Sequence, residues 1–448
     1  MRSTLPTFNE VWQQQLRSCL LNTWPSADVK FLIACSGGMD SMLLLHVMSV
    51  LFPEKIRAIY INHQLQQHSA SWGEFVRLEC EKLNLNCVVA EVDVQNGNLE
   101  NQARIARYQA FEQHIAPDEI LVLAHHQQDQ AETVLLHLFS GSGVDGLSAM
   151  RIHDPRTHLN IWRPFLNLSR EQISQWVQQH HIAYIQDPTN FDTHYDRAWC
   201  RETLWPLLQS RFPQMQQAIS RSSLLMQDAA EILAELAQQD LKSCGDVHQL
   251  DLKLLQELSI PRQRQLLSNW MKGQAAYRPS LATVERIQSE VIAAKSDARS
   301  ALHHAGFYYL RYQNVLYKVS KAEYLAQQQS PVPQELSVSL DQKIKLAAGE
   351  FCIRQQAWGL SWDLLEQPLS VMPRIGGEKI HLHGRVGHWP LKKAIQAAQI
   401  FPWQRHQIQI LSKDDVMLGV FTPKGFWLAE SQYNQQHGWQ PQLLFSTP

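Results

Sequence analysis

The stretch that decides the fold covers residues 31–48 and reads FLIACSGGMDSMLLLHVM. It begins with five apolar residues, as in a strand buried on both faces, and it ends with a mostly apolar segment typical of a buried helix. Between the two lies the run Ser36-Gly37-Gly38-Met39-Asp40-Ser41. Glycines let the backbone approach a ligand closely, and the N–H groups at a helix N-terminus attract anions. The stretch therefore predicts a phosphate-binding loop, although it lacks the Gly-Lys-Ser/Thr ending of the Walker type.

Short apolar strands alternate with helical stretches from residue 29 to about residue 190. We predict strands at 31–35, 56–61, 86–92 and 120–124, and helices at 41–51, 70–83, 99–115 and 129–139. This alternation is typical of an α/β protein with a doubly wound parallel sheet, in which ligands bind at the carboxyl ends of the strands. Ser36, His63 and His126 lie just beyond predicted strands, so we expect them to meet in one crevice.

The pattern changes beyond residue 200. Long helices rich in Gln and Leu are predicted at 215–241 and 261–272, which indicates a helical domain. Residues 327–334 include two prolines and are predicted to form a linker, because proline cannot pair inside a sheet. Short β-like runs at 335–340, 351–354 and 416–421, with a helix near 391–399, indicate a small C-terminal α+β domain. We therefore predict domains at 1–212, 213–328 and 329–448.

The composition excludes several classes of protein. The 448 residues carry a net charge of −2, so any surface that binds nucleic acid must be local. The seven cysteines are scattered without a C-x-x-C pair, which argues against a disulfide framework, an iron–sulfur cluster or a structural zinc. Residues 1–21 contain no signal-peptide core, and no apolar stretch is long enough to span a membrane. We therefore expect a cytoplasmic protein with no membrane partner.

Two pairs of charged residues are candidates for chemistry. Asp129 and Glu132 lie three positions apart at the start of a predicted helix, so their side chains share one face. Such carboxylates can hold an ammonium group, but acidic residues also favour helix N-termini as caps alone. Arg104 and Arg107 also share a helical face, where they either clamp a phosphate or face solvent.

Two segments have a composition suited to RNA. Residues 187–201 interleave polar, aromatic and basic side chains, with Arg197 and Arg201 four positions apart. Between Val371 and Arg405, six basic residues accompany a single acid, with two tryptophans among them. This basic segment is expected to hold an RNA backbone, the alternative being an ordinary solvated surface. Its basic residues include Arg385, Lys392, Lys393 and Arg405.

Taken in order, these motifs resemble those of the tRNA(Ile)-lysidine synthetases, which belong to the PP-loop class of N-type ATP pyrophosphatases. The matching residues are 36–41, His63, Glu100-x-x-Ala103-Arg104-x-Ala106-Arg107-Tyr108, His126-x-x-Asp129-Gln130-x-Glu132-Thr133, Gly141-Ser142-Gly143-x-x-Gly146-Leu147, Arg163-Pro164, Asp187-x-x-Asn190 and Tyr195-Asp196-Arg197-x-x-x-Arg201. The tail residues Leu391-Lys392-Lys393 and Pro402-Trp403-Gln404-Arg405 resemble the family's C-terminal signatures. Four positions depart from the family pattern: Gln128 replaces an aspartate, Ser140 a basic residue, Ala198 an asparagine and Phe401 a proline.

The resemblance implies an ATP-dependent ligation of L-lysine to C2 of the wobble cytidine of a tRNA(Ile) with a CAU anticodon. An adenylated cytidine is the implied intermediate, and AMP and pyrophosphate are the other products. The resemblance implies that residues 36–41 bind ATP, that Asp40 binds Mg²⁺, and that Arg104 and Arg107 bind phosphate or the cytidine. It implies proton transfer or hydrogen bonding by His63 and His126, and lysine binding by Asp129 and Glu132. The implied tRNA-binding residues are Arg197, Arg201, Arg385, Lys392, Lys393 and Arg405.

Several alternatives stay open at this point. A PP-loop tRNA thiolase would also adenylate a base, but such enzymes usually need a cysteine pair, and none is evident here. Another adenylating amide ligase would use ammonia and need no RNA, and a non-catalytic tRNA-binding protein would carry only a relic loop. The residue that deprotonates lysine is not assigned between Asp129, Glu132 and a histidine. A monomer and a homodimer are equally admissible.

Overall fold

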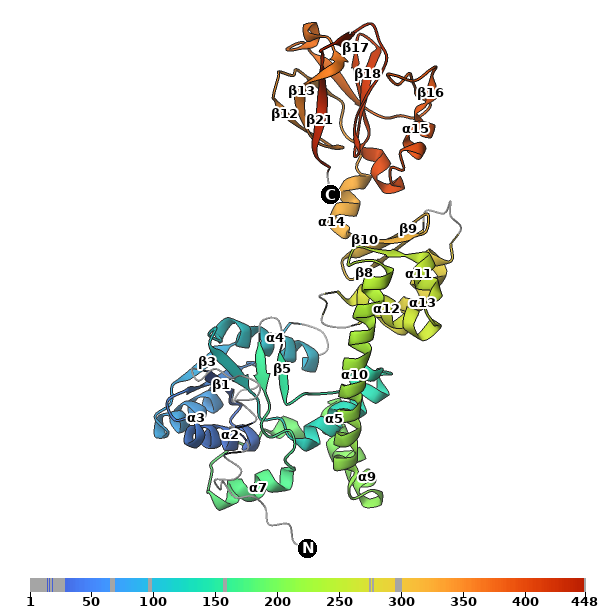
Figure 1. Cartoon of the computed structure of the whole chain (residues 1–448). Helices are drawn as coiled ribbons and strands as arrows, with labels where there is room; N and C mark the ends of the chain where they lie inside the picture. The colour runs from blue at the N-terminus through green and yellow to red at the C-terminus, as the bar shows by residue number, and fades with distance from the viewer. Residues whose placement is uncertain are drawn as a thin grey trace. The chain divides into compact units, whose positions relative to one another are not determined.

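The structure is a computed structural model that describes residues 14, 16, 18, 29–64, 69–95, 99–155, 159–273, 275, 278–294 and 300–446. The expectation about a signal peptide concerns residues 1–21, nearly all of which lie outside the described residues. The chain divides into two compact units, Met1–Ile232 and Leu233–Pro448, and each is described by itself (Figure 1).

The first unit is built on a six-stranded sheet with the order β3-β2-β1-β4-β6-β5. Its strands are β1 (Lys30–Ala34), β2 (Ile56–Asn62), β3 (Cys87–Glu91), β4 (Glu119–Val122), β5 (His153–Pro155) and β6 (Asn160–Trp162). All neighbours pair in parallel except β5, which lies antiparallel to β6 at the edge. The four strands predicted from the sequence are β1 to β4, so the doubly wound parallel sheet is confirmed.

Helices cover both faces of this sheet (Figure 1). They include α2 (Met39–Leu51), α3 (Ser69–Lys82), α4 (Leu99–His114), α5 (Gln127–Phe139) and α7 (Arg170–Gln179). Because strand side chains alternate, Phe31 and Ile33 of β1 share a core with α2, α3 and α7, whereas Leu32 shares a core with Phe111 of α4. Each fully buried apolar side chain of this size stabilises the fold by about 1.5–3 kcal/mol. The two cores fix β1, and hence the loop that follows it.

The first unit ends in a series of short helical segments. These are α6 (Val144–Leu147), η1 (Pro188–Phe191), α8 (Asp196–Trp199), the π-helical turn η2 (Cys200–Leu204) and α9 (Trp205–Arg211). The helix α10 (Met215–Cys244) follows, and the boundary between the two units lies within it. Ala131 of α5 packs against Trp205 and Met215, so α5 is held from the side opposite to the sheet.

The second unit begins with a layer that the sequence predicts only in part. The predicted helices are found as α10 and α12 (Ile260–Lys272), with α11 (Leu252–Glu257), α13 (Leu281–Arg286) and η3 (Ile287–Ile292) beside them. A four-stranded antiparallel sheet accompanies them and was not predicted. Its order is β7-β10-β9-β8, for the strands β7 (Gln249–Asp251), β8 (Ala301–His304), β9 (Phe307–Tyr312) and β10 (Val315–Ser320). Its strands are short, and β9 and β10 carry half-buried residues on both faces, so the alternation of polar and apolar residues is weak.

The C-terminal part of the second unit is rich in strands (Figure 1). One sheet contains β11 (Gln334–Leu336), β14 (Leu369–Pro373), β17 (Gln409–Lys413), β18 (Val416–Thr422) and β19 (Gly425–Leu428). Another contains β12 (Lys343–Leu346), β13 (Gly349–Leu360), β20 (Asn434–Gln436) and β21 (Trp439–Ser446). The remaining elements are α14 (Lys321–Gln328), η4 (Trp362–Leu364), the pair β15 (Lys379–Ile380) and β16 (Trp389–Pro390), α15 (Leu391–Ala397) and η5 (Pro402–Gln407).

The predicted C-terminal elements are found close to their expected positions. The runs at 351–354 and 416–421 lie within β13 and β18, and the helix near 391–399 is α15. The run at 335–340 is strand only to Leu336, and the predicted linker begins within α14 and ends at the first residue of β11. Within the described residues, six cysteines are free thiols, and no helix is long and apolar enough to cross a membrane.

Candidate active site

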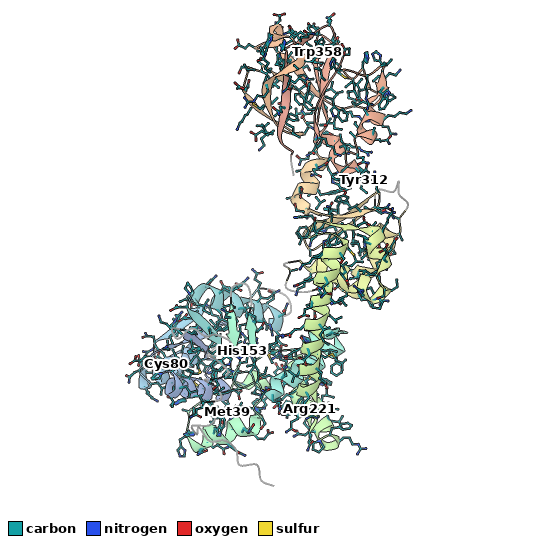
Figure 2. All side chains as sticks on the ribbon, viewed as in Figure 1. Met39, Cys80, His153, Arg221, Tyr312 and Trp358 are labelled. Carbon is teal, nitrogen blue, oxygen red and sulfur yellow. The ribbon has the colours of Figure 1, made fainter. Side chains whose placement is uncertain are left out.

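The loop after β1 has the geometry of an anion cradle. Gly37 adopts φ +82°, and its carbonyl oxygen accepts a hydrogen bond from the N–H of Ile185 at 2.8 Å. The Ser41 hydroxyl closes the loop, because it accepts from the N–H of Ser36 at 3.1 Å and donates to the carbonyl oxygen of Gly38 at 3.0 Å. The helix α2 begins at Met39, which is labelled in Figure 2. No side chain caps its N-terminus. The first N–H groups of α2 are therefore available to a ligand.

Asp40 lies in the first turn of α2 and faces the start of α5. Its Oδ1 atom is buried and has no hydrogen-bond partner among the described residues, and it lies 3.8 Å from Nε2 of His126. Burial raises the pKa of Asp40, while the His126 imidazole opposes this shift. A buried carboxylate oxygen without a donor is suited to a cation or to the proton of a neighbour.

His126 forms the N-cap of α5, and its ring orientation follows from that position. The N–H of Gln128 donates to Nδ1 at 3.2 Å, and the N–H of His126 donates to Oδ2 of Asp129 at 3.0 Å. Because Nδ1 is an acceptor, the neutral ring carries its proton on Nε2. That atom lies 3.5 Å from Oδ2 of Asp129 and 3.8 Å from Oδ1 of Asp40. Asp129 therefore acts as a helix cap and also lies beside the His126 ring, and its role toward lysine stays a prediction.

Asp129 stays ionised in this arrangement. Burial alone would raise the pKa of Asp129, but the His126 and His125 imidazoles, the N–H of His126 and the Arg197 guanidinium lower it below its ordinary value. The side chain is 16% exposed, so one carboxylate oxygen can still reach a ligand. Asp40 and Asp129 thus place two acidic groups with opposite pKa shifts near the same atom, Nε2 of His126.

Glu132 is placed differently from Asp129. It is completely buried and forms a two-pronged ion pair with Arg201, in which Nε donates to Oε1 and Nη2 to Oε2, both at 2.9 Å. The side-chain amide of Gln128 donates to Oε1 as well, at 3.0 Å. Both oxygens of Glu132 are therefore occupied by groups of the protein. This placement argues against the prediction that Glu132 holds a lysine directly.

The two arginines predicted to bind tRNA in this segment also point inward. Arg201 lies in the π-helical turn η2. Its Nη2 atom is 3.8 Å from Oδ1 of Asp129 and 2.9 Å from Oε2 of Glu132. The Nε atom of Arg197 is 3.2 Å from Oε1 of Glu100 in α4, and its Nη2 donates to the hydroxyl of Thr133 at 3.5 Å. Their roles in the structure are contacts between helices, which does not support the prediction of a direct contact with RNA.

His63, just beyond β2, and Arg104 and Arg107 of α4 were also predicted as site residues. His63 follows β2, and its Nδ1 atom is buried without a hydrogen-bond partner among the described residues. Burial lowers the pKa of His63, and the Arg107 guanidinium lowers it further. Arg104 lies over the ring of Tyr108, with 5.4 Å between its Cζ atom and the ring centroid. Arg107 also acts on His125, so the structure brings the residues of β2, α4 and α5 into one electrostatic environment.

Two residues of the cluster were not among those predicted. Arg163 is 1% exposed, and its Nε donates to Nδ1 of His125 at 3.3 Å. Burial lowers the pKa of His125 to about 3, with help from the positive charges of Arg163, Arg107 and Arg197. His125 is therefore neutral at physiological pH. The sequence offered a signal for both, since His125 follows a predicted strand and Arg163 belongs to an Arg-Pro motif, but neither position alone specifies a role.

Comparisons with known proteins show the family of the chain. Three family models match the chain: a PP-loop domain at residues 8–208, a TilS substrate binding domain at 250–317 and a TilS substrate C-terminal domain at 369–443. The tRNA(Ile)-lysidine synthase of Acinetobacter baylyi is 61% identical over 448 residues, which cover 99% of this chain and 97% of the relative. The chain belongs to the tRNA(Ile)-lysidine synthase family.

More distant relatives give the same family name. The tRNA(Ile)-lysidine synthase of Alkalilimnicola ehrlichii is 32% identical over 400 residues, covering 87% of this chain and 88% of the relative. Among solved structures, the U34-tRNA thiolase NcsA from Methanococcus maripaludis matches with 14% identity and a TM-score of 0.41, over 49% of this chain and 79% of the other.

One departure from the tRNA(Ile)-lysidine synthase pattern has a clear structural meaning. Gln128 is 5% exposed and stands where the family usually has an aspartate. An aspartate carboxylate beside the buried Glu132 would repel it, whereas the glutamine amide donates to it at 3.0 Å.

Ser140 caps the C-terminus of α5, and its hydroxyl donates to the carbonyl oxygen of His137 at 2.9 Å. Ala198 is buried, and nothing in the structure explains its replacement of an asparagine.

The residues of the basic segment lie in the second unit and differ in exposure. Lys392 and Lys393, in the first turn of α15, are exposed, and so is Arg385 in the loop between β15 and β16. Arg405 is half-buried, and its Nε donates to the carbonyl oxygen of Ile400 at 3.2 Å. The side chains of Arg385, Lys392 and Lys393 are therefore placed for an external partner, whereas part of the Arg405 guanidinium is already occupied.

Proposed function

We propose that the chain ligates L-lysine to C2 of the wobble cytidine of a tRNA(Ile) with a CAU anticodon, at the expense of ATP. In the first step the C2 oxygen of the cytosine attacks the α-phosphorus of ATP and pyrophosphate leaves. In the second step the ε-amine of lysine attacks C2, and AMP leaves with that oxygen. The observation that carries the proposal is the uncapped N-terminus of α2 directly beside Asp40, His126 and Asp129.

The loop at residues 36–41 fits the departing pyrophosphate. The free N–H groups at the start of α2 and the positive φ of Gly37 provide a cradle of backbone donors. Asp40 is suited to Mg²⁺, because its Oδ1 is buried without a donor. No group of three or more acidic, His or Cys side chains among the described residues is arranged to hold a metal, so Asp40 would share the ion with phosphate oxygens, which is how Mg²⁺ usually binds. The ion would supply charge neutralisation at the phosphates.

Arg104, Arg107 and the two strand-end histidines are proposed to contact the phosphate and the cytidine. His126 presents a protonated Nε2 to the site, so it can donate a hydrogen bond to charge that develops on the reacting oxygen. His63 is kept neutral by burial and by Arg107, so it can act as a proton acceptor or a hydrogen-bond partner.

Asp129 is proposed to hold the ammonium group of lysine. It is ionised, partly exposed and close to His126. Glu132 is proposed to act through Arg201, because its two oxygens keep that guanidinium in place beside Asp129. Arg201 retains N–H donors for the carboxylate of the amino acid. Lysine binding thus depends on Asp129 by contact and on Glu132 by positioning.

The tRNA is proposed to be held in part by the exposed basic residues of the second unit, Arg385, Lys392 and Lys393. Unpaired cations on a protein of nearly zero net charge provide the local field that RNA binding needs. From its composition, the enzyme is proposed to work in the cytoplasm.

The test is to incubate the purified protein with Mg-ATP, labelled lysine and an isoleucine tRNA transcript bearing CAU, and to measure label in the RNA together with AMP. We expect ATP-dependent labelling that disappears when the wobble cytidine is replaced. AMP without RNA labelling would keep the adenylation chemistry but assign another nucleophile. Absence of both products would contradict the proposal and leave a protein that only binds RNA.

A further inference from the structure

Gln130 lies near the start of α5, directly after Asp129, and it belongs to the motif around His126, but the proposed reaction gives it no role. It is 4% exposed, and a buried amide is unfavourable unless its oxygen and its nitrogen are both hydrogen-bonded. Its side-chain nitrogen donates to the hydroxyl of Ser223 in α10 at 2.7 Å, and Ser223 is completely buried. Gln130 is therefore a buried contact between α5 and α10, which lie side by side (Figure 1).

The same amide holds the segment at residues 148–150. The side-chain oxygen of Gln130 accepts from the N–H of Met150 at 3.0 Å, and its nitrogen donates to the Met150 carbonyl oxygen at 2.8 Å. The helix α10 bonds to this segment as well. The Ser223 hydroxyl donates to the carbonyl oxygen of Ser148 at 2.9 Å, and the Gln227 amide donates to the carbonyl oxygens of Ser148 and Met150, both at 2.9 Å. The segment therefore ties α10 to α5.

The backbone of this segment is strained at its centre. Ala149 has φ +49°, a left-handed conformation in which the Cβ atom of an alanine crowds the following carbonyl. Such a conformation persists only where the surrounding structure fixes it. The side chains of α5 and α10 do so here, because they bond to both neighbours of Ala149, Ser148 and Met150. The connection between the two helices is therefore held in one conformation.

We propose that Gln130 is a positioning residue for lysine, because together with Ser223 and Gln227 of α10 it fixes the start of α5 and hence the place of the Asp129 carboxylate. The inference rests on the proposed function, in which Asp129 holds the ammonium group of lysine. Asp129 and Gln130 are consecutive residues of one helix, so a shift of the Gln130 backbone moves Asp129 with it. A binding group displaced by about 1 Å loses much of its contribution.

The ATP loop does not share this support. The loop at residues 36–41 is closed by the Ser41 hydroxyl and anchored by the N–H of Ile185. Asp129, by contrast, owes its distance of 3.5 Å from Nε2 of His126 to the setting of α5. Loosening the contacts of Gln130 should therefore affect lysine and spare ATP, which distinguishes positioning from a general effect on the fold.

The experiment measures the KM for lysine and the KM for ATP in the labelling assay, using variants of α10 that lie outside the proposed lysine site. Gln227→Glu keeps the size of the side chain but places a carboxylate against two carbonyl oxygens, whereas Gln227→Lys retains N–H donors there. Ser223→Ala removes the hydroxyl that joins α10 to Gln130. Ser222→Ala is the matched control, because it makes the same change at the neighbouring, exposed serine.

We expect Gln227→Glu and Ser223→Ala to raise the KM for lysine by about three- to tenfold. The KM for ATP and the kcat at saturating lysine should stay close to those of the wild type. Gln227→Lys and Ser222→Ala should keep the wild-type KM for both substrates. Gln130→Ala removes the centre of the network and should raise the KM for lysine the most.

Urea titrations of the same variants separate a folding defect from a displaced carboxylate. An unchanged KM for lysine in folded Gln227→Glu and Ser223→Ala would overturn the inference and leave the ligase proposal intact. An equal rise in the KM for lysine and for ATP would also overturn it, because the network would then serve only the stability of the first unit. Absence of lysine incorporation by the wild type would overturn the proposed function itself, and the inference with it.

Discussion

The arginines of the first unit and the basic residues of the C-terminal region differ in what they contact. Arg201 and Arg197 are held by Glu132 and Glu100 within the protein, whereas Lys392 and Lys393 face solvent. In the sequence the two groups look alike, since both are closely spaced basic residues among aromatic ones. The difference teaches that closely spaced basic residues can serve two ends: the first group forms ion pairs inside the protein beside the proposed site, and the second is exposed to solvent.

The largest effect should come from an acid of the first unit, Asp40. Replacing Asp40 with asparagine removes the carboxylate that lies beside His126 in the first turn of α2. We expect AMP formation to fall by about 10²–10³-fold. The control is Asp118→Asn, which removes a half-exposed partner of Lys30 and should leave the rate unchanged. If both variants kept the wild-type rate, Asp40 would have no place in the chemistry.

The comparison is tested most directly by removing one cation from each group. Arg201→Ala leaves the buried carboxylate of Glu132 without its partner, so the free energy of unfolding should fall by about 3–5 kcal/mol. Lys393→Ala should change it by less than about 0.5 kcal/mol, because the side chain is exposed. Urea titrations provide the measurement. Adding Glu132→Gln to Arg201→Ala should recover part of the loss, and similar values for the two single variants would break the comparison.

The second group should show the opposite profile, with an effect on RNA and none on stability. The double variant Lys392→Ala with Lys393→Ala removes two cations that can neutralise phosphates. The slope of log K against log salt for tRNA should become shallower by about 2, with weaker binding at low salt. The matched control replaces Lys343 and Lys345, two exposed lysines on β12. Equal salt dependence in the two double variants would remove the distinction between the cation groups.

A smaller effect concerns the pH dependence of stability. The folded state lowers the pKa of Asp129, so its carboxylate stabilises the fold above its ordinary pKa of about 4, and this contribution is lost as the pH falls through the lower folded value. Asp129→Asn keeps an oxygen for the N–H of His126 but loses this charge. The variant should be less stable than the wild type at pH 7, and the difference should shrink as the pH falls below the ordinary aspartate pKa of about 4. Urea midpoints measured across this range would show a constant difference if the charge of Asp129 were unimportant.

Much of the fold follows from local sequence, but the partners of the charged residues do not. The strand and helix positions around residues 31–48 depend on apolar periodicity, which a single segment displays. The pairing of Glu132 with Arg201 joins residues 69 positions apart and depends on how η2 packs against α5. No rule of residue spacing indicates that the Glu132 carboxylate is buried and paired with Arg201. The departure at Gln128 can be explained only once the structure shows that its side-chain amide lies 3.0 Å from Oε1 of Glu132.

The four-stranded sheet at the start of the second unit was harder to predict, for a different reason. The strands β7 to β10 are three to six residues long, and several of their side chains are half-buried on both faces. Such strands lack the strict alternation that marks a sheet with one wet face. Tyr309 and Leu316 are buried against Trp270 and its neighbours, so the sheet is stabilised by tertiary packing with α12.

The hydrogen bond from Ile185 to Gly37 has a consequence for the order in which the protein is made. The loop proposed to bind phosphate is among the first segments to leave the ribosome, yet the N–H that anchors it belongs to a residue synthesised much later. At about 5–20 residues per second, the nascent loop waits on the order of ten seconds for its anchor. A chain interrupted before α7 lacks this anchor, and it also lacks the α7 side chains that pack on β1. Binding of ATP to nascent or truncated chains would therefore begin only once the segment after α7 has emerged.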